Sequence, residues 1–391
     1  MKPAQKPKQM PNQKPKFQPD MKPVGILGGG QLARMLALKA HDLGIPVSVL
    51  SENPGDPAAQ VTALWVQGRL DDRKSLHDFM KRCSVVTFES EFLDAQVLGE
   101  IQKETQVPVY PKTQDMATLQ DRLTQKTWLV KNGLATSEFT PVTTELDVRQ
   151  VFREFGGKVV FKKRRFGYDG YGTFIARNES DLESISSEVV RSEHGFIAER
   201  FVPFKREIAV MAARGLNGKT TLLPFVQTHQ ENSRCLWVKG PLKETPAFKT
   251  MAKKIVKFLA TIDYVGIMGI ELFDTGRELL VNELAPRVHN SGHYSLDALT
   301  TDQFSLHLKA LLGLDLGQPA PLKKGFAMYN LLGTSLQKPE WMPEATRDVK
   351  LHWYGKSENR PGRKMGHVTT LDATPEKALA RLKLNRKLWK I

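Results

Sequence analysis

The chain has 391 residues, 40% hydrophobic and 25% charged, a composition typical of a globular protein with two or three domains. Its formal net charge is +15, of which residues 1–22 carry +5 and residues 347–391 carry +8, so only +2 belongs to residues 23–346. A near-neutral body with two basic ends argues against a dedicated nucleic-acid-binding protein.

The cysteine count and the hydropathy pattern exclude two further classes of protein. Cys83 and Cys235 are the only cysteines; they cannot form a disulfide framework and supply no CxxC metal site, so a cytoplasmic location is expected. No apolar run approaches the ~18 residues of a membrane span, and the N-terminus lacks the apolar core of a signal peptide.

Residues 1–22 form a segment rich in Pro, Lys and Gln, in which proline recurs at every fourth position from Pro3 onward. Such a segment buries too little apolar surface to fold, so it is predicted to be disordered. Three interpretations stay open: an electrostatic tether to an acidic partner, a solvated tail, or an untranslated stretch upstream of a true start at Met21.

Residues 23–118 show the pattern of a doubly wound parallel sheet, that is, a Rossmann-like domain. The expected elements are a strand at 24–27, a glycine turn at 28–30, a helix at 31–43, and strands at 46–50 and 84–88. Glu89 and Glu91 follow the last of these strands, at the edge of the sheet where ligands of such folds bind.

The glycine turn matches the dinucleotide fingerprint in its alanine variant, Gly28-x-Gly30-x-x-Ala33, and Glu52 stands near the place of a ribose-binding acid. By itself this favours a nicotinamide-dependent enzyme. The same glycines suit any ligand phosphate at a helix N-terminus, or a plain tight turn.

After residue 118 the pattern becomes mixed α and β, and residues 119–320 are predicted as a second domain. The expected elements are a helix at 120–131, strands at 158–163, 195–201, 206–213 and 221–226, a helix at 246–262, a hairpin at 266–283 and a helix at 301–312. Residues 321–391 are expected to form a small C-terminal unit of short strands, with a basic end.

A glycine-rich loop at 167–172 follows Lys162 at the end of a predicted strand. Its backbone N–H groups can surround phosphate oxygens, for which Lys162 adds a positive charge; the alternative is an ordinary hairpin turn. Further on, the strand end at 199–202 offers backbone groups to an adenine edge, and Glu207 can hold ribose hydroxyls.

Two glutamates, Glu271 and Glu283, lie on the two strands of the predicted hairpin. With an odd loop at 275–277 they share a face as diagonal neighbours, whereas an even loop places them on opposite faces. On one face, together with Asn282, they can hold Mg²⁺ and nucleotide phosphates; the alternative is a pair of solvated side chains.

Two polar loops complete the pattern. Residues 284–293 bring Arg287, His289 and Asn290 next to the carboxylate pair, a density of hydrogen-bonding groups that favours a functional site. Residues 354–367 are basic and rich in turn residues, which is typical either of a phosphate-binding loop or of a solvated basic surface.

In chain order, the motifs are GGGQL, QDR, RRxGYDG, ExxVPFxRE, NExAPRxHNSGH and RPGRKMGH. This set resembles the N5-carboxyaminoimidazole ribonucleotide synthetase family, ATP-grasp enzymes of purine biosynthesis, over residues 22–372. The resemblance implies an α/β protein with a Rossmann-like pre-ATP-grasp domain, an ATP-grasp α+β domain and a small C-terminal β-rich domain.

The resemblance also implies an activity. ATP phosphorylates bicarbonate to carboxyphosphate, whose breakdown delivers carbon dioxide to the amine of aminoimidazole ribonucleotide. ATP, Mg²⁺ and bicarbonate are the implied cofactors and co-substrates. The implied assembly is a homodimer without a nucleic-acid or membrane partner.

Carried over by position, the resemblance assigns residues to four roles. Bicarbonate and the ribonucleotide are surrounded by Tyr168, Asp169, Arg287, His289 and Asn290. The metal ligands are Glu271 and Glu283, and the substrate phosphate is held by Lys356 and Arg363. ATP is contacted by Arg122, Lys162, Gly167, Tyr168, Asp169, Gly170, Tyr171, Gly172, Thr173, Glu199, Arg200, Phe201, Val202, Glu207, His229, Asn282 and Glu283.

The chain departs from the family pattern at Phe92, Phe166, Tyr171 and Thr173, where the family usually has Asn, Gly, Lys or Arg, and Gln. These departures keep open an ATP-grasp ligase with another acceptor, or a weakened paralogue that only binds nucleotide. A nicotinamide-dependent enzyme is a further alternative, against which the motifs beyond residue 120 speak.

Overall fold

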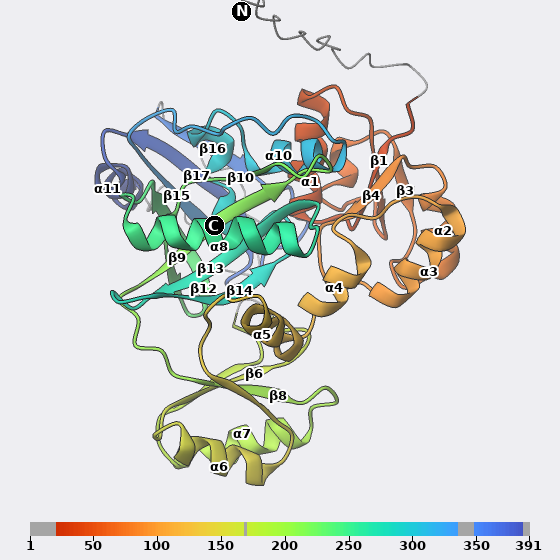
Figure 1. Cartoon of the computed structure of the whole chain (residues 1–391). Helices are drawn as coiled ribbons and strands as arrows, with labels where there is room; N and C mark the ends of the chain where they lie inside the picture. The colour runs from red at the N-terminus through yellow and green to blue at the C-terminus, as the bar shows by residue number, and fades with distance from the viewer. Residues whose placement is uncertain (1–20, 168–169, 335–347, 386–391) are drawn as a thin grey trace, which may run out of the picture.

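The computed structural model describes residues 21–167, 170–334 and 348–385 (Figure 1). The predicted tail, except for its last two residues, lies outside the described residues, as do Tyr168 and Asp169.

The N-terminal part is a parallel sheet with strand order β3-β2-β1-β4, which confirms the doubly wound pattern expected there. Its strands are β1 (Val24–Leu27), β2 (Val47–Ser51), β3 (Trp65–Gln67) and β4 (Val85–Phe88), and its helices are α1 (Gln31–Asp42), α2 (Arg73–Met80), α3 (Ala95–Thr105) and α4 (Thr113–Leu119). The apolar side of α1, from Leu32 to Ala40, packs on β1 and β2. This packing fixes the glycine turn at the carboxyl edge of the sheet.

A larger antiparallel sheet forms the centre of the molecule. In the part of the chain that the structure describes it has nine strands, in the order β14-β13-β9-β11-β12-β15-β17-β16, with β10 paired to β9. The strands before the C-terminal unit are β9 (Arg206–Arg214), β10 (Thr220–Leu222), β11 (Val226–Glu231), β12 (Arg234–Gly240), β13 (Gly266–Asp274) and β14 (Leu279–Ala285). The strand predicted at 221–226 is wrong, because Pro224, which has no N–H to donate, separates β10 from β11.

The helices α5 (Arg122–Lys131), α8 (Pro246–Thr261), α9 (Ser295–Ala298) and α10 (Gln303–Leu311) accompany this sheet. The long helix α8 buries Phe248, Ile255 and Phe258 against β9 and β14. Within the described residues, no helix is both long and apolar enough to cross a membrane.

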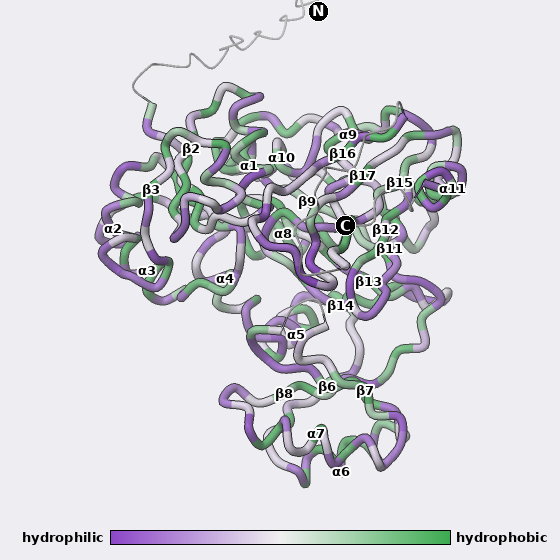
Figure 2. The backbone as a smooth tube through the Cα atoms, turned by 180° about the vertical axis from the view of Figure 1, so that it is seen from behind, coloured by the Kyte–Doolittle hydropathy of each residue, from purple (hydrophilic) through white to green (hydrophobic). Residues whose placement is uncertain are grey.

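A second, smaller sheet lies apart from the large one, at the bottom of Figure 1. It has the order β5-β8-β6-β7, from β5 (Phe139–Val142), β6 (Val159–Lys163), β7 (Thr173–Ala176) and β8 (Phe196–Arg200), with α6 (Glu145–Glu154) and α7 (Ser180–Val190) on one face. Hydrophilic and hydrophobic stretches alternate along these two helices (Figure 2), as expected for helices with one buried side.

The C-terminal unit continues the large sheet, because β15 (Gly325–Leu332) pairs with β12, and β17 (Lys364–Asp372) lies between β15 and β16 (Val349–Trp353). A helix that the sequence interpretation missed, α11 (Pro375–Asn385), packs on β15 and β17 through Ala378 and Leu382. The boundaries predicted at 118/119 and 320/321 stay predictions.

A buried histidine joins the N-terminal sheet to the large sheet. His307 Nδ1 accepts the N–H of Ile267 at 3.1 Å, so the neutral ring carries its proton on Nε2, which lies 2.8 Å from Thr87 Oγ1 on β4. Burial lowers the pKa of His307 to about 3. The ring therefore stays neutral, and it fixes β4, with the glutamates that follow it, relative to β13.

We expect His307→Ala to lower the free energy of unfolding by about 2–4 kcal/mol near pH 7, because it removes two buried hydrogen bonds and leaves a cavity. The native pKa lies below that of an unfolded histidine, about 6.5, so the stabilisation is present above pH 6.5 and is lost as the pH falls toward 3. Denaturant unfolding of wild type and variant at several pH values measures both effects.

The matched control is His41→Ala, on the exposed side of α1, for which we expect a change within about 0.5 kcal/mol. If the difference in unfolding free energy between wild type and His307→Ala does not become smaller below pH 6, the prediction is contradicted.

Candidate active site

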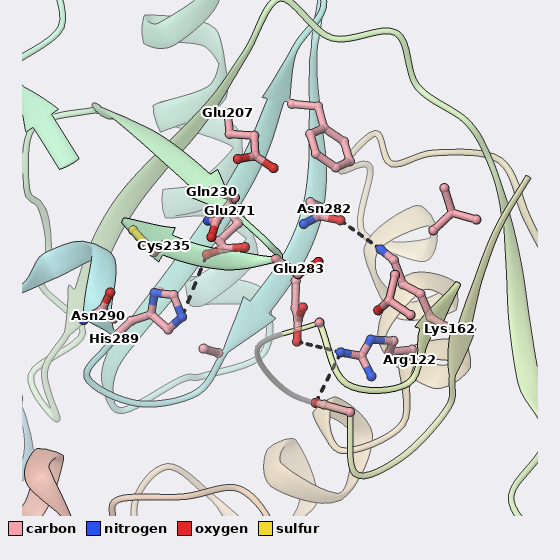
Figure 3. A pocket seen from close by; sticks show the side chains of 18 of the residues that line it. Arg122, Lys162, Glu207, Gln230, Cys235, Glu271, Asn282, Glu283, His289 and Asn290 are labelled. Atoms are coloured by element: carbon pink, nitrogen blue, oxygen red, sulfur yellow. Dashed lines mark hydrogen bonds and ion pairs between the residues drawn. The ribbon is translucent and has the colours of Figure 1, made fainter. Parts of the chain in front are cut away.

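A pocket of about 540 Å³ lies between the small sheet, the large sheet and the N-terminus of α1. Most of the predicted site residues line it: Arg122, Lys162, Gly167, Gly170, Thr173, Glu199, Arg200, Phe201, Val202, Glu207, Glu271, Asn282, Glu283, Arg287, His289 and Asn290. Side chains from both sheets and from α5 converge in the close view of Figure 3.

Other predicted residues do not line this pocket. His229 is exposed and stacks on Trp237, with ring centroids 4.8 Å apart, whereas its neighbour Gln230 lines the pocket. Successive residues of a strand point to opposite faces. Because Gln230 faces the pocket, His229, which precedes it on the strand, faces away from the pocket. Tyr171, Gly172, Lys356 and Arg363 are also absent from the lining, and Tyr168 and Asp169 lie outside the described residues.

One end of the pocket is apolar. Val160 on β6 and Ile175 on β7 line it beside Phe201 and Val202, and Phe204 stacks on Phe273 with ring centroids 4.7 Å apart. Flat apolar walls at a strand end suit a planar heteroaromatic ring.

Lysine and carboxylate groups form a connected charge network beside this apolar end. Lys162 Nζ lies 2.9 Å from Glu199 Oε1 and donates to Asn282 Oδ1 at 3.1 Å. The other Glu199 oxygen, Oε2, lies 3.0 Å from Lys126 Nζ and accepts from Ser137 Oγ at 2.7 Å. Burial alone would raise the pKa of Glu199, but the two ammonium groups bring it down to about 2. The Glu199 carboxylate is therefore ionised and already paired.

The helix α5 attaches the glycine-rich loop to the large sheet. Arg122 donates to the carbonyl of Lys163 at 3.0 Å and to that of Gly167 at 3.4 Å, and lies 3.4 Å from Glu283 Oε1 (Figure 3). At the start of the helix, Asp121 accepts from the backbone N–H of Leu123, a typical N-cap. The QDR motif thus supplies a cap and a guanidinium that borders the pocket.

A β-bulge places the two predicted metal ligands opposite each other. Asp274 pairs with Leu279, so the hairpin loop has an even number of residues, 275–278, and the predicted loop 275–277 is wrong. An even loop alone would separate the glutamates, but the register shifts between Glu271 and Leu272, and Glu271 then pairs directly with Glu283. Asn282 is the extra residue of the bulge.

Negative charge at the carboxylate pair is only partly compensated. Burial, followed by the charges of Glu283 and Glu207, raises the pKa of Glu271 to about 7; burial raises that of Glu207 to about 7 as well. A divalent cation would remove this repulsion, so the donor set fits Mg²⁺. Among the described residues no group of three or more His, Cys, Asp or Glu is arranged to hold a metal, and Mg²⁺ sites commonly combine one or two carboxylates with substrate phosphates.

His289 is held in one tautomer. Its Nδ1 lies 2.9 Å from Ser291 Oγ and accepts the backbone N–H of Ser291 at 3.4 Å, so the neutral ring carries its proton on Nε2, 3.9 Å from Glu271 Oε1. Burial, together with the Arg287 charge, lowers the pKa of His289 to about 3. Gln303 fixes the backbone here: it accepts from the His289 N–H and donates to its carbonyl, both at 2.9 Å.

Asn290 and Arg287 are each oriented by a residue of another domain. The amides of Asn290 and Asn330 exchange two hydrogen bonds, at 3.0 and 2.7 Å, and Asn330 lies on β15. Arg287 forms a two-pronged ion pair with Glu91, with Nη2 3.0 Å from Oε1 and a second bond from Nε to Oε2. Sequence reasoning missed Lys126, Asn330 and Gln303, because single polar residues on predicted core elements gave no signal.

The glycine turn holds a carboxylate of the chain itself. Glu89 accepts from the backbone N–H groups of Gly30 at 2.6 Å and Ala33 at 3.2 Å. A Cβ at Gly30 would lie 2.6 Å from Glu89 Oε1, which explains the glycine there. Glu89 therefore takes the place that a dinucleotide phosphate would occupy, and the nicotinamide interpretation of this turn is wrong.

The predicted phosphate-binding loop lies beside this turn. The carbonyl of Gly355 accepts from Gln60 Nε2 at 2.7 Å. Burial raises the pKa of Glu89, and the positive charge of Lys356 opposes this rise. Arg363 donates to the Glu358 carbonyl at 3.1 Å, and its neighbour Lys364 lines the pocket. The loop thus brings cations to the end of the pocket near the N-terminus of α1, which is called its open end below.

Two departures from the family pattern touch each other. The rings of Phe92 and Phe166 lie 6.1 Å apart at their centroids, and Phe166 has a φ of 60°, a conformation that glycine adopts without strain. Tyr171 is 60% exposed, and Lys163 Nζ lies 5.2 Å from its ring centroid.

Comparison with known proteins gives the same three parts. The chain matches the ribonucleotide synthetase preATP-grasp domain at residues 21–120, the ATP-grasp domain at 127–304 and the phosphoribosylaminoimidazole carboxylase C-terminal domain at 327–381. These matches confirm the predicted fold class.

Relatives of known name are similar over most of their length. The N5-carboxyaminoimidazole ribonucleotide synthase of Synechococcus elongatus is 40% identical over 352 residues, 88% of either chain. The crystal structure of the synthetase from Thermus thermophilus has a TM-score of 0.84 at 34% identity, covering 93% of this chain and 98% of that one. The Aspergillus clavatus synthase, solved with ADP and 5-aminoimidazole ribonucleotide, has a TM-score of 0.84 at 29% identity, covering 94% and 98%.

We expect Glu89→Ala to lower the free energy of unfolding by about 1–2 kcal/mol, because two N–H groups at the start of α1 lose their acceptor. Thermal unfolding measures this change, with Glu52→Ala, at an exposed position after β2, as the control. An unchanged unfolding temperature in Glu89→Ala, or binding of NAD⁺ to the wild-type chain in a calorimetric titration, would count against the role given to Glu89.

Proposed function

Because the chain belongs to the family of N5-carboxyaminoimidazole ribonucleotide synthases, we propose that it is an ATP-grasp ligase of de novo purine biosynthesis. It carboxylates 5-aminoimidazole ribonucleotide with bicarbonate, through carboxyphosphate, to N5-carboxyaminoimidazole ribonucleotide. The observation that carries this proposal is the convergence of Lys162, Arg122 and the Glu271–Glu283 pair on one pocket beside Arg287 and His289.

The two sheets divide the binding of ATP between them. The adenine occupies the apolar end near Phe201 and Val202, where the strand end after β8 offers backbone groups, and Glu207 takes the ribose hydroxyls. The phosphates lie under the glycine-rich loop, next to Lys162 and Arg122. Positioned cations of this kind stabilise the charge of a transferring phosphoryl group.

Glu271 and Glu283 hold Mg²⁺, with Asn282 next to them. Burial, and after it the repulsion between these carboxylates, raises the pKa of Glu271, which supports the assignment. A bound Mg²⁺ supplies charge neutralisation for the ATP phosphates.

The loop after β14 binds bicarbonate and the acceptor. Arg287, oriented by Glu91, holds the anionic bicarbonate and the carboxyphosphate formed from it. His289 presents a neutral Nε2–H, and Asn290 an amide fixed by Asn330. At the open end Lys356 and Arg363 hold the 5′-phosphate of the ribonucleotide, and Tyr168 and Asp169 stay predicted contacts.

Purified protein with ATP, Mg²⁺ and bicarbonate is expected to release ADP faster when aminoimidazole ribonucleotide is added. A coupled ADP assay measures the rate, and the omission of bicarbonate is the control. ADP release that the ribonucleotide does not stimulate would overturn the proposal. Stimulation by another amine in a substrate panel would show that the departures at Phe92 and Tyr171 alter the acceptor.

The homodimeric state and the cytoplasmic location stay predictions.

We expect Glu283→Gln to lower kcat by about 100-fold or more while the fold is kept, because one ligand of Mg²⁺ is lost next to the transferring phosphoryl group. The matched control is Glu278→Gln, in the exposed turn of the same hairpin, which should retain the wild-type rate. Turnover of Glu283→Gln at the wild-type rate would remove the magnesium assignment.

A further inference from the structure

Lys126 lies on α5, and its buried ammonium group contacts three polar groups of the protein. Its side chain is 2% exposed, and Nζ lies 2.7 Å from Thr136 Oγ1, 2.9 Å from Ser137 Oγ and 3.0 Å from Glu199 Oε2. An ammonium group has three N–H donors. These three contacts use all of them, so Lys126 has none left for a ligand.

Glu199 connects Lys126 to the pocket. One of its oxygens faces Lys126 and the other faces Lys162, at 3.0 and 2.9 Å. The three side chains therefore carry one net positive charge, and of the two lysines it is Lys162 that lines the pocket. Without Lys126 the remaining pair would be neutral, and the wall facing the phosphates would lose its surplus charge.

From this arrangement we propose that Lys126 is a positioning residue for nucleotide binding: it neutralises Glu199, so that Glu199 orients Lys162 without cancelling the charge that Lys162 presents to the phosphates. The inference rests on the proposed function, because it takes the pocket to bind ATP.

The burial of Lys126 ties its charge to that of Glu199. Burial lowers the pKa of Lys126 to about 8, although Glu199 acts in the opposite direction. Replacing a whole buried ion pair by apolar residues is often neutral for stability, whereas removing one partner leaves the other charge buried and uncompensated. A neutral side chain at this position of α5 could fill the space, but Lys162 would then be the one lysine that compensates the charge of Glu199.

The helix itself suits this role, because it presents two cations one turn apart. Arg122 faces Glu283, and Lys126, four residues later on the same side of the helix, faces Glu199. Gln125 between them bonds the N–H of Leu284 at 2.9 Å and its carbonyl at 3.2 Å, which docks α5 on β14. One helix thus sets the charges on both sides of the phosphate position.

The test is a double-mutant cycle on the full chain, with ADP affinity from calorimetry and kcat and KM for ATP from the ADP-release assay. We expect Lys126→Met to weaken ADP binding and raise the KM for ATP by about tenfold or more, a coupling of ~1.4 kcal/mol, with kcat at saturating ATP within about threefold. Lys126→Gln, which keeps polar contacts without charge, should show the same loss.

The cycle separates charge from structure. In a Glu199→Gln background there is no carboxylate for Lys126 to neutralise, so we expect Lys126→Met to change ADP affinity by less than about threefold there. Lys131→Met, at an exposed position on the same helix, should match the wild type.

Two results would overturn the inference alone: wild-type ADP affinity in Lys126→Met, or an equal loss with and without Glu199. Failure of the wild-type chain itself to bind ADP would instead overturn the proposed function, and the inference with it.

Discussion

Glu199 lies between two lysines and is buried, and the geometry of the pocket depends on this contact. The carboxylate on β8 receives Lys126 from α5 and Lys162 from β6, and Lys162 in turn reaches Asn282 on β14. One buried anion thereby links the small sheet, the helix and the large sheet. Such a group is costly to bury unless it is paired, so the elements have to meet where both lysines reach the carboxylate.

The opposite wall of the pocket carries two negative groups held close together by the backbone. The bulge at Asn282 brings Glu271 and Glu283 together, and Arg122 lies 3.4 Å from Glu283 Oε1. Burial, followed by the charges of the neighbouring carboxylates, raises the pKa of Glu271, and burial raises that of Glu207. A pocket with cations on one wall and a pair of adjacent carboxylates on the other is suited to a magnesium–nucleotide complex, whose two components carry opposite charge.

The N-terminal domain contributes orientation to this pocket. His307 fixes β4 against β13, and the loop after β4 then supplies Glu91 to Arg287 and Glu89 to the start of α1. The glycine turn that looks like a dinucleotide site is thus occupied by the chain's own carboxylate. The C-terminal unit acts in the same way through Asn330, because β15 continues the large sheet up to the loop that holds Asn290.

The sequence by itself determined the fold class and most of the pocket lining, because glycine turns, hydrophobic periodicity and motif order are local properties of the chain. Arg122, Lys162, Glu271, Glu283 and Arg287 could all be named from it. The tertiary structure alone decided the pairing of Glu271 with Glu283, since a one-residue bulge reverses the parity of a hairpin. It also decided which face His229 takes, what fills the glycine turn and which buried partners orient the site, because Lys126, Gln303 and Asn330 acquire their roles only from contacts between distant segments.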